Sequence, residues 1–493
     1  MYAHSCRKAV SGADQNKKNA IKIKYKFSGG FLVKNCAIIL AGGEGTRMKS
    51  SKPKAMAEIL FRPMIDRVMD AALGAGVEDI CVVTGYRAEI LDEHLKGRAE
   101  TVHQAERLGT GHAVMQAADF IKEHSGVNVL ILNGDAPFID SKTIADALEY
   151  HIANRFVQTV ISAKIDNPFG YGRIVRDKNE SFKAIVEEAS ADCKTKKIKE
   201  INSGAMWFDC DTLTELLGLL TNDNSKGEYY ITDTVSIALG KGLKVGAFAA
   251  DNADAVLGAN TRMQLAELNE LLRKKVMTEL MTEGVSVPCS DGVMIDDDAE
   301  IGADTVILPG TIIKHGCKIG KNCVIGPNTV LFDTTVGDNC TLNSVQAESA
   351  VIHDNASIGP FAHLRPGAEI GESSHCGNFT EVKNSKIGHH TSVSHLTYVG
   401  DSDVGNGVNF GCGCVTVNFN GKNKNRCVIG DDAFIGCNTN LIAPVTVGDR
   451  AFTAAGSTVT DDVPADALAI ARERQTNKEG WVTDKKPYRP KKY

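Results

Sequence analysis

The sequence lacks any long hydrophobic run. None of its 493 residues lies in a stretch that approaches about 18 consecutive apolar residues, the length that a membrane-spanning helix requires. The 14 cysteines form no CxxC pair, and no apolar segment with a small-residue cleavage site precedes the first strand-like run at Cys36. We therefore expect a cytoplasmic protein with reduced thiols, no membrane span and no disulfide framework. The Cys and His residues show no zinc-ligand spacing.

Basic residues are concentrated at the two ends of the chain. Residues 1–34 carry eight Lys and Arg against one acid, and residues 472–493 carry eight against three, although the net charge is −6. The part between them is therefore acidic, and its composition shows no basic face for nucleic acid. We interpret residues 1–34 as a disordered basic extension and residues 472–493 as a solvated basic tail, rather than as nucleic-acid-binding arms.

Residues 35–260 alternate short apolar runs with helical patterns. Apolar runs begin at Cys36, Asp79 and Val127, and a helical pattern covers residues 64–74. This alternation predicts βαβ units and a parallel sheet. Residues 261–284 contain no proline and no internal glycine and place apolar residues at helical spacing, so we expect a linker helix between two domains.

One aliphatic residue recurs every six positions in the C-terminal part, residues 285–471. A period of six fits neither an α-helix nor a lone strand, and it predicts a parallel β-helix with three short faces in each coil. Residues 416–428 break the period and are polar, so we expect them to project as a loop that either binds a ligand or is a tolerated insertion. The periodic residues are Ile295, Ile301, Ile307, Ile313, Ile319, Ile325, Leu331, Ile358, Leu364, Ile370, Ile429, Ile435, Leu441, Val447 and Val459.

Two segments of the N-terminal domain suggest phosphate and metal chemistry. The glycine-rich segment LAGGEGTRM, residues 40–48, follows a buried strand, and its backbone N–H groups could approach an anion where helix geometry begins. Arg47 and Lys54 add positive charge suited to a triphosphate. Asp135 follows the apolar run of ILNGDAP, at the sheet edge where α/β proteins bind ligands, and its carboxylate could hold Mg²⁺. A structural turn at the glycines and an Asx turn before Pro137 are the alternatives.

Taken together, the motifs resemble those of one bacterial enzyme family. LAGGEGTRM, KPK, QAERLGTGHAV, NGDAP, GYGRIV, IVEE, INSGA, GEYYITD and LGANTR occur in the order and spacing of the bifunctional N-acetylglucosamine-1-phosphate uridyltransferases and glucosamine-1-phosphate acetyltransferases, and the similarity covers residues 35 to 480. It implies a Rossmann-like α/β nucleotidyltransferase domain followed by a left-handed parallel β-helix, in a homotrimer that acts on small molecules and makes a precursor of peptidoglycan and lipopolysaccharide.

The resemblance assigns roles in transfer of a uridylyl group from UTP. A sugar 1-phosphate would attack the α-phosphorus in line and release pyrophosphate, with Arg47, Lys54 and Mg²⁺ neutralising charge. Asp135 and Asn260 would hold the Mg²⁺. Glu44 stands where a basic residue is common, and Asn133 replaces a frequent aromatic. The residues implied to bind the nucleotide and its sugar are Leu40, Ala41, Gly42, Gly43, Lys54, Gln104, Gly109, Thr110, Asn133, Gly134, Asp135, Gly172, Glu187, Asn202 and Asn260.

The resemblance also assigns roles in acetyl transfer from acetyl-CoA. The reaction needs a base that removes an amine proton, and an imidazole suits that task near neutral pH. The candidate is His395 in SHLTYVGD, strengthened by Glu381 beside it. Arg365 and Lys383 would bind the sugar phosphate, and Tyr398 and Asn409 the sugar. The implied acetyl-CoA contacts are Cys412, Asn418, Phe419, Cys437, Ala455 and Arg472, of which Phe419 stands where Tyr is usual and the two cysteines replace small residues.

Two other functions compete with this interpretation. The chain could be a nucleotidyltransferase for another sugar whose β-helix is only structural or regulatory, but Lys383, His395 and the projecting loop argue against it. It could instead be an inactive scaffold, which the combination of Lys54, Asp135 and Asn260 opposes.

Overall fold

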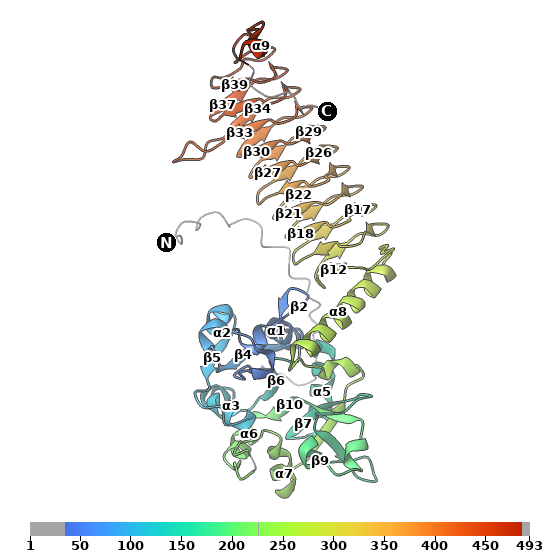
Figure 1. Cartoon of the computed structure of the whole chain (residues 1–493). Helices are drawn as coiled ribbons and strands as arrows, with labels where there is room; N and C mark the ends of the chain where they lie inside the picture. The colour runs from blue at the N-terminus through green and yellow to red at the C-terminus, as the bar shows by residue number, and fades with distance from the viewer. Residues whose placement is uncertain (1–34, 225, 486–493) are drawn as a thin grey trace.

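The computed structural model describes residues 35–224 and 226–485, so the predicted basic extension and the last part of the predicted C-terminal tail lie outside the described residues. Two bodies follow one another along the chain, and a long helix, α8 (Arg262–Thr282), joins them (Figure 1). The first is a helix-covered sheet and the second is a stack of short strands. Nowhere in the described ranges is a helix both long enough and apolar enough to cross a membrane.

The sheet of the first body has a main path of seven strands in the order β11-β7-β10-β6-β1-β4-β5. Its strands β1, β4, β5 and β6 run parallel, as predicted, and β11 runs parallel to β7. The prediction of an all-parallel sheet is wrong at β10, which is antiparallel to both β6 and β7, because a β8–β9 hairpin replaces a crossover helix before it. The strands are β1 (Asn35–Leu40), β4 (Val77–Thr84), β5 (Glu100–His103), β6 (Asn128–Asn133), β7 (Gln158–Lys164), β8 (Arg173–Arg176), β9 (Phe182–Val186), β10 (Glu200–Asp209) and β11 (Val245–Ala249).

Both faces of this sheet are buried. Alternate residues of β1 enter two different apolar clusters, Cys36 and Ile38 on one face and Ala37 and Ile39 on the other. That burial explains why β1 is a continuous apolar run rather than an alternating one. The covering helices are α1 (Met64–Gly74), α2 (Ala88–Leu95), α3 (Thr110–Gln116), α4 (Ala118–Glu123), α5 (Ser141–Asn154), α6 (Cys210–Leu217) and α7 (Asp233–Gly240).

The second body is a parallel β-helix, as predicted. From β12 to β36 each strand pairs in parallel with the strand three places further along, and β38 pairs with β40. Three sheets therefore wind around one apolar core, consistent with a left-handed β-helix. The first sheet holds β12 (Met294–Ile295), β15 (Ile312–Ile313), β18 (Val330–Phe332), β21 (Gln346–Glu348), β24 (His363–Leu364), β27 (Glu381–Lys383), β30 (Tyr398–Gly400), β33 (Val415–Val417), β36 (Asn440–Ile442) and β39 (Thr458–Val459). The second holds β13 (Glu300–Ile301), β16 (Lys318–Ile319), β19 (Thr335–Val336), β22 (Val351–Ile352), β25 (Glu369–Ile370), β28 (Lys386–Ile387), β31 (Ser402–Val404), β34 (Cys427–Ile429) and β37 (Val445–Val447). The third holds β14 (Val306–Ile307), β17 (Val324–Ile325), β20 (Thr341–Leu342), β23 (Ser357–Ile358), β26 (His375–Asn378), β29 (Ser392–His395), β32 (Asn409–Phe410), β35 (Phe434–Ile435), β38 (Phe452–Thr453) and β40 (Leu468–Ala469).

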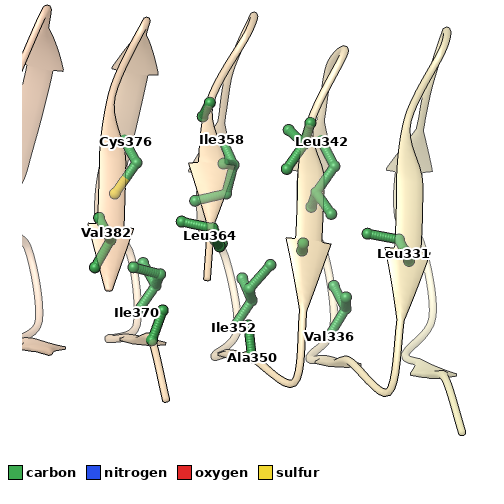
Figure 2. Packing of buried hydrophobic residues seen from close by; sticks show 14 of the residues in the cluster. Leu331, Val336, Leu342, Ala350, Ile352, Ile358, Leu364, Ile370, Cys376 and Val382 are labelled. Atoms are coloured by element: carbon green, nitrogen blue, oxygen red, sulfur yellow. The ribbon is translucent and has the colours of Figure 1, made fainter. Parts of the chain in front are cut away.

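The periodic aliphatic residues point into this core. Figure 2 shows Leu331, Leu342, Ile358 and Leu364 stacked along it, and all four are at most 1% exposed. The period of six is not kept everywhere, because the core steps from Leu331 to Val336 after five residues at a shorter corner. The segment after Val417 leaves the stack and returns at Cys427 (Figure 1), so the predicted projecting loop is present.

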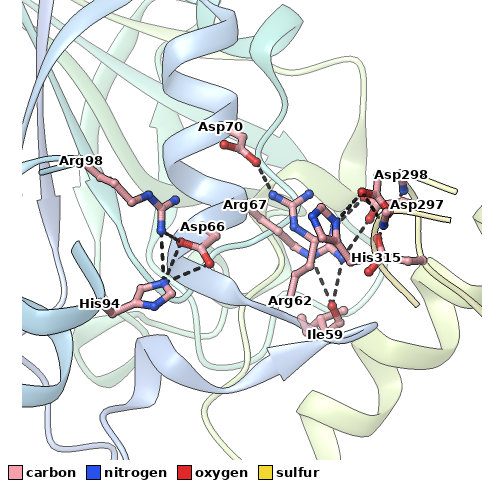
Figure 3. A network of polar contacts seen from close by, with 12 residues as sticks. Ile59, Arg62, Asp66, Arg67, Asp70, His94, Arg98, Asp297, Asp298 and His315 are labelled. Atoms are coloured by element: carbon pink, nitrogen blue, oxygen red, sulfur yellow. Dashed lines mark hydrogen bonds and ion pairs between the residues drawn. The ribbon is translucent and has the colours of Figure 1, made fainter. Parts of the chain in front are cut away.

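One apolar cluster runs through the junction of the two bodies. It joins Ile59 and Leu60 of the first body to Leu272 of α8 and to Val293 and Ile295 of the first coil. Polar contacts flank it, since Arg67 of α1 donates two hydrogen bonds to Asp297 (Figure 3). The first coil is therefore fixed to the nucleotidyltransferase-like body by both apolar packing and an ion pair.

Candidate functional sites

The glycine-rich loop lies at the carboxyl end of β1. Ala41 donates a backbone hydrogen bond to Val83 at 2.9 Å, and Gly134 donates one to Leu40 at 2.9 Å, so the loop is fixed to both neighbouring strands. Gly43 is exposed, and apart from Gly43 and its two chain neighbours no described residue has an atom within 4 Å of the position that a Cβ would occupy. Its backbone is therefore open to a ligand.

The expected helix start after this loop is replaced by a shorter element. Gly45 takes a left-handed φ of 60°, and the chain then forms one 3₁₀ turn, Thr46–Met48. A single turn has no developed helix dipole, so an anion at this loop would depend on backbone N–H groups and side-chain cations. The helix that begins here is thus only one 3₁₀ turn long, and phosphate binding at the loop stays a prediction.

Lys54, Asp135 and Asn260 meet at the carboxyl edge of the sheet. The Lys54 ammonium contacts Asp135 and donates a hydrogen bond to the Asn260 amide oxygen at 2.8 Å. Arg47 donates to the same oxygen at 3.1 Å. These residues come from the loop after β1, the turn after β6 and the start of α8. Four predicted site residues from three distant parts of the chain are thus in direct contact.

The oxygen atoms of Asp135 and Asn260 fit a magnesium ion. Both are hard oxygen ligands, and both converge on one cation, the Lys54 ammonium. Mg²⁺ commonly takes one or two protein ligands of this kind and completes its shell with water and substrate phosphates. A site with two protein oxygens therefore fits an ion that is held jointly with a phosphorylated substrate.

The predicted uracil-reading element lies beside the glycine-rich loop. Gln104 is 6% exposed and donates hydrogen bonds to the Gly109 carbonyl at 3.2 Å and to the His112 ring at 3.1 Å. A Cβ added to Gly42 would lie 3.0 Å from the Gln104 side-chain oxygen. A depression lined by Gly85, Tyr86, His103, Gln104, Ala105 and Arg107 opens here.

Glycine at position 109 is required by its neighbours. Its φ is 102°, and a Cβ would lie 2.5 Å from the Tyr229 carbonyl oxygen. The adjacent Thr110 hydroxyl accepts a hydrogen bond from Ile231 N at 3.1 Å. The segments RLGTGH and GEYYITD, more than 100 residues apart, are therefore packed against each other.

The predicted sugar-side residues form a second group. Asn202 N donates to the Gly172 carbonyl at 2.9 Å, and a Cβ on Gly172 would lie 3.3 Å from the Glu187 carboxylate. The Asn133 side chain lies against Gly204, where a Cβ would be 2.2 Å from its nitrogen. Asn133 is also the last residue of β6, so it links this group to the Asp135 end of the sheet.

In the β-helix, a buried carboxylate organises the predicted sugar-phosphate site. Asp401 is 4% exposed, contacts Asn418 and accepts a hydrogen bond from Asn384 at 2.5 Å. The Lys383 ammonium lies 3.9 Å from it. Asn418 also donates to the Tyr398 hydroxyl at 3.4 Å. The base of the projecting loop is thereby tied to two neighbouring coils.

Two lysines share this region. The Lys424 ammonium beside Lys383, together with burial, lowers the pKa of Lys383 below its usual value, although Asp401 opposes the shift. An anion bound between the two lysines would relieve their repulsion. The pair therefore suits the phosphate of a ligand.

Arg365 and Glu381 lie on neighbouring coils of the first sheet, whereas His395 ends β29 of the third sheet. Arg365 donates a hydrogen bond to Glu381 at 2.9 Å. His395 is exposed at the end of β29, and within residues 35–224 and 226–485 no hydrogen bond joins its ring to Glu381. The closeness of Glu381 to His395 stays a prediction, whereas the Arg365–Glu381 contact is a relationship that the sequence did not indicate.

The predicted acetyl-CoA residues lie along the upper coils. Strands β32 and β35 pair with Phe410 opposite Ile435. This register places Cys412 and Cys437 at equivalent positions of neighbouring coils. Phe419 is 54% exposed on the projecting loop. Asn409, Ala455 and Arg472 are also exposed, and the Arg472 side chain lies 3.7 Å from the position of a Cβ on Gly456, next to Ala455.

The sequence did not single out several residues that the structure brings to these sites. Asp401, Asn384 and Lys424 belong to the sugar-phosphate region, and no pattern in the sequence marks Asp401 as buried. Arg107 contacts Glu44, so the acidic residue in the glycine-rich loop has a basic partner across the uracil-side depression.

Comparison with known proteins agrees with this division. Residues 36–259 match the family described as nucleotidyl transferase, and residues 298–332 and 426–461 match the bacterial transferase hexapeptide family of six repeats. The bifunctional protein GlmU of Acetivibrio thermocellus is 47% identical over 456 residues, which cover 92% of this chain and 99% of that protein. GlmU of Clostridium kluyveri is 46% identical over 92% of this chain and 99% of its own, and GlmU of Clostridioides difficile is 42% identical over 91% and 97%. The chain therefore belongs to the bifunctional GlmU family, and it is an enzyme that joins a nucleotidyltransferase domain to a hexapeptide-repeat acyltransferase domain.

Proposed function

We propose that the chain acetylates glucosamine 1-phosphate with acetyl-CoA and then transfers a uridylyl group from UTP to the N-acetylglucosamine 1-phosphate so formed. The observation that carries the proposal is the convergence of Lys54, Asp135, Asn260 and Arg47 on one point. The 13 cysteines among the described residues are free, and free thiols are usual for an enzyme of the reducing cytoplasm, which is the location that we propose.

The nucleotidyltransferase domain would position two phosphates and neutralise their charge. Asp135 and Asn260 would hold Mg²⁺, which when bound supplies charge neutralisation at the triphosphate. Lys54 contacts both of these oxygens and Arg47 contacts that of Asn260, and both cations would donate hydrogen bonds to phosphate oxygens instead. Leu40 to Gly43 would line the nucleotide, Gln104, Gly109 and Thr110 the uracil side, and Gly172, Glu187 and Asn202 the sugar side. The sugar phosphate oxygen then attacks the α-phosphorus and pyrophosphate leaves.

The β-helix would carry out the acetyl transfer. Arg365 and Lys383 supply positive charge for the sugar phosphate, beside Tyr398 and Asn409 for the sugar. His395 takes a proton from the attacking amine, the amine forms an amide with the acetyl carbon, and the thiol of coenzyme A leaves. Asn418, Phe419, Cys412, Cys437, Ala455 and Arg472 would contact the coenzyme, and Glu381 would support the base.

We further propose that the active form is a homotrimer. Hexapeptide β-helices have flat sides suited to threefold packing, and exposed apolar side chains form rows on this one, with Phe361 stacked on Phe379 and Phe434 on Phe452. Light scattering should give three times the chain mass. A monomer with full acetyltransferase activity would refute the proposal.

One incubation tests the two reactions together. Glucosamine 1-phosphate, acetyl-CoA, UTP and Mg²⁺ are supplied, and each is omitted in turn. Omission of acetyl-CoA should stop both products, and omission of UTP should leave N-acetylglucosamine 1-phosphate. Formation of a nucleotide sugar without acetyl-CoA would favour a nucleotidyltransferase for another sugar.

A further inference from the structure

A carboxylate at the start of the β-helix is buried without a partner. Asp296 is 0% exposed, and within the described part of the chain its Oδ2 has no hydrogen-bond partner. Its Oδ1 accepts a long hydrogen bond from Asp298 N at 3.3 Å, and its carboxyl group lies beside that of Asp297. A buried carboxylate needs a compensating positive charge or a proton.

The nearby arginines are already engaged elsewhere. Arg67 donates its hydrogen bonds to Asp297 and to the Ile59 carbonyl, and Arg62 contacts Asp70 (Figure 3). Their charges are therefore matched by other groups. Arg62 also lies near Asp296, but among the described residues neither arginine donates a hydrogen bond to Asp296.

Two further ligand-type side chains accompany Asp296. Asp298 and His315 each offer one atom, and these atoms and one from Asp296 all lie within 4.8 Å of one another. Ligands at about 2.0–2.2 Å from a zinc ion lie up to about 4.4 Å apart across it, so small movements would close the shell. The His315 ring contacts Asp298, which also accepts a hydrogen bond from Gly316 N at 3.3 Å.

We propose that Asp296, Asp298 and His315 bind a divalent transition-metal ion, Zn²⁺ in particular. An imidazole nitrogen with two carboxylate oxygens favours such an ion over Mg²⁺ or Ca²⁺. The side chains of Asp298 and His315 are 31% and 62% exposed, which leaves an entry path and room for water as further ligands. No thiol is part of the group.

The proposed ion would join the first two coils beside the domain junction. Asp296 and Asp298 follow β12, and His315 follows β15, the strand that pairs with β12. Asp297, between the two aspartates, is the residue that holds Arg67 of the first domain. An ion here would therefore order the coil that carries the inter-domain ion pair.

Zinc counting on matched variants tests the proposal. The reduced full-length chain is dialysed against Zn²⁺ with Mg²⁺ in excess, and bound zinc is measured by mass spectrometry for the parent, His315→Gln, Asp298→Asn and His353→Gln. His353 is the control because it also forms an exposed contact to a carboxylate, with Glu369 at 3.3 Å, but has no buried aspartate beside it. The parent and His353→Gln should each retain one more Zn²⁺ per chain than His315→Gln and Asp298→Asn.

Two further measurements keep the outcome decisive. Co²⁺ in the parent should give weak d–d bands without sulfur charge-transfer bands, and His315→Gln should lose them. Zn²⁺ should raise the melting temperature of the parent by a few degrees and leave that of Asp298→Asn unchanged. The proposal is overturned if all four proteins retain the same amount of zinc. It is also overturned if the Co²⁺ that is lost from the variants shows sulfur charge-transfer bands. A proton would then offset the charge of Asp296.

Discussion

Arg67 of α1 donates hydrogen bonds to Asp297 of the first β-helix coil from both terminal nitrogens of its guanidinium, at 2.5 and 3.1 Å. The same side chain donates to the Ile59 carbonyl at 2.9 and 3.3 Å, so its charge and its donors are largely used. The pair joins residues 230 positions apart and lies beside the apolar cluster that runs through the junction. Arg67 therefore links the two catalytic domains directly.

Arg67→Met should weaken this junction. It leaves Asp297 without its partner, which costs about 3–5 kcal/mol for a fully buried pair. Because the Asp297 side chain is 31% exposed, we expect about 2 kcal/mol. Urea unfolding, followed by tryptophan fluorescence, measures this loss in the free energy of unfolding. Arg98→Met, which removes a more exposed partner of Asp66, is the matched control and should cost less than about 1 kcal/mol.

A second variant separates loss of the pair from loss of packing. Arg67→Met with Asp297→Asn no longer buries an unpaired carboxylate, so it should recover part of the stability. If the double variant is as unstable as Arg67→Met alone, the ion pair does not explain the effect.

Asp135→Asn should abolish most uridylyl transfer and spare acetylation. The change removes the carboxylate charge that faces Lys54, so neither the ammonium nor a bound metal is held as before. Loss of one electrostatic contact of this kind typically costs about 10² to 10³ in kcat. Separate assays of pyrophosphate release and of coenzyme A release measure the two reactions.

Asp119→Asn is the control for that experiment. Asp119 is an exposed aspartate of the same domain, and it pairs with Lys122 of the same helix at 3.2 Å. Both reactions should run at the parent rate in this variant. Uridylyl transfer by Asp135→Asn at that rate would remove Asp135 from the catalytic site.

Asp401 should stabilise the β-helix at neutral pH and lose this effect in acid. Burial raises its pKa, but the hydrogen bonds from Asn384 and Asn418 and the charges of Lys383 and Lys424 outweigh burial, so the pKa lies below its usual value. A carboxyl with a lowered folded pKa contributes its full stability above the unfolded value, about 3.9, and loses it as the pH falls through the folded value.

The contribution of the Asp401 charge to stability can be measured by comparing the free energies of unfolding of the parent and Asp401→Asn at several pH values. At about pH 7 the parent should be more stable by about 2 kcal/mol, the scale of hydrogen bonds to a charged group. The difference should shrink as the pH falls below about 4. A difference that is constant with pH would show that shape, not charge, makes Asp401 important.

The fold was largely predictable because its patterns are local. The apolar run at β1 and the six-residue spacing from Ile295 to Leu331 each report burial that repeats along the chain. The step of five from Leu331 to Val336 was not visible, because corner length depends on backbone turns rather than on the apolar pattern. The antiparallel β10 was missed because strand direction follows from the β8–β9 hairpin, not from composition.

The site residues could be predicted only where they belong to motifs that resemble those of the family. Lys54 and Asn260 are 206 positions apart, and no spacing rule places them together, so their contact followed from family resemblance alone. The roles of Asp401 and Asp296 escaped the sequence, because burial of a carboxylate and the presence or absence of its partners depend on packing between coils.

His395→Ala should abolish most acetyl transfer and leave uridylyl transfer intact. If His395 removes the amine proton, its loss should lower kcat by about 10² to 10⁴. The ring is exposed, so its removal should open no cavity in the β-helix core. His353→Ala, another exposed histidine of the same β-helix, controls for a general surface effect, and His395→Asn with a melting curve controls for stability. Separate rates of coenzyme A release and pyrophosphate release give the answer. Acetylation by His395→Ala at the parent rate would place the base on another residue.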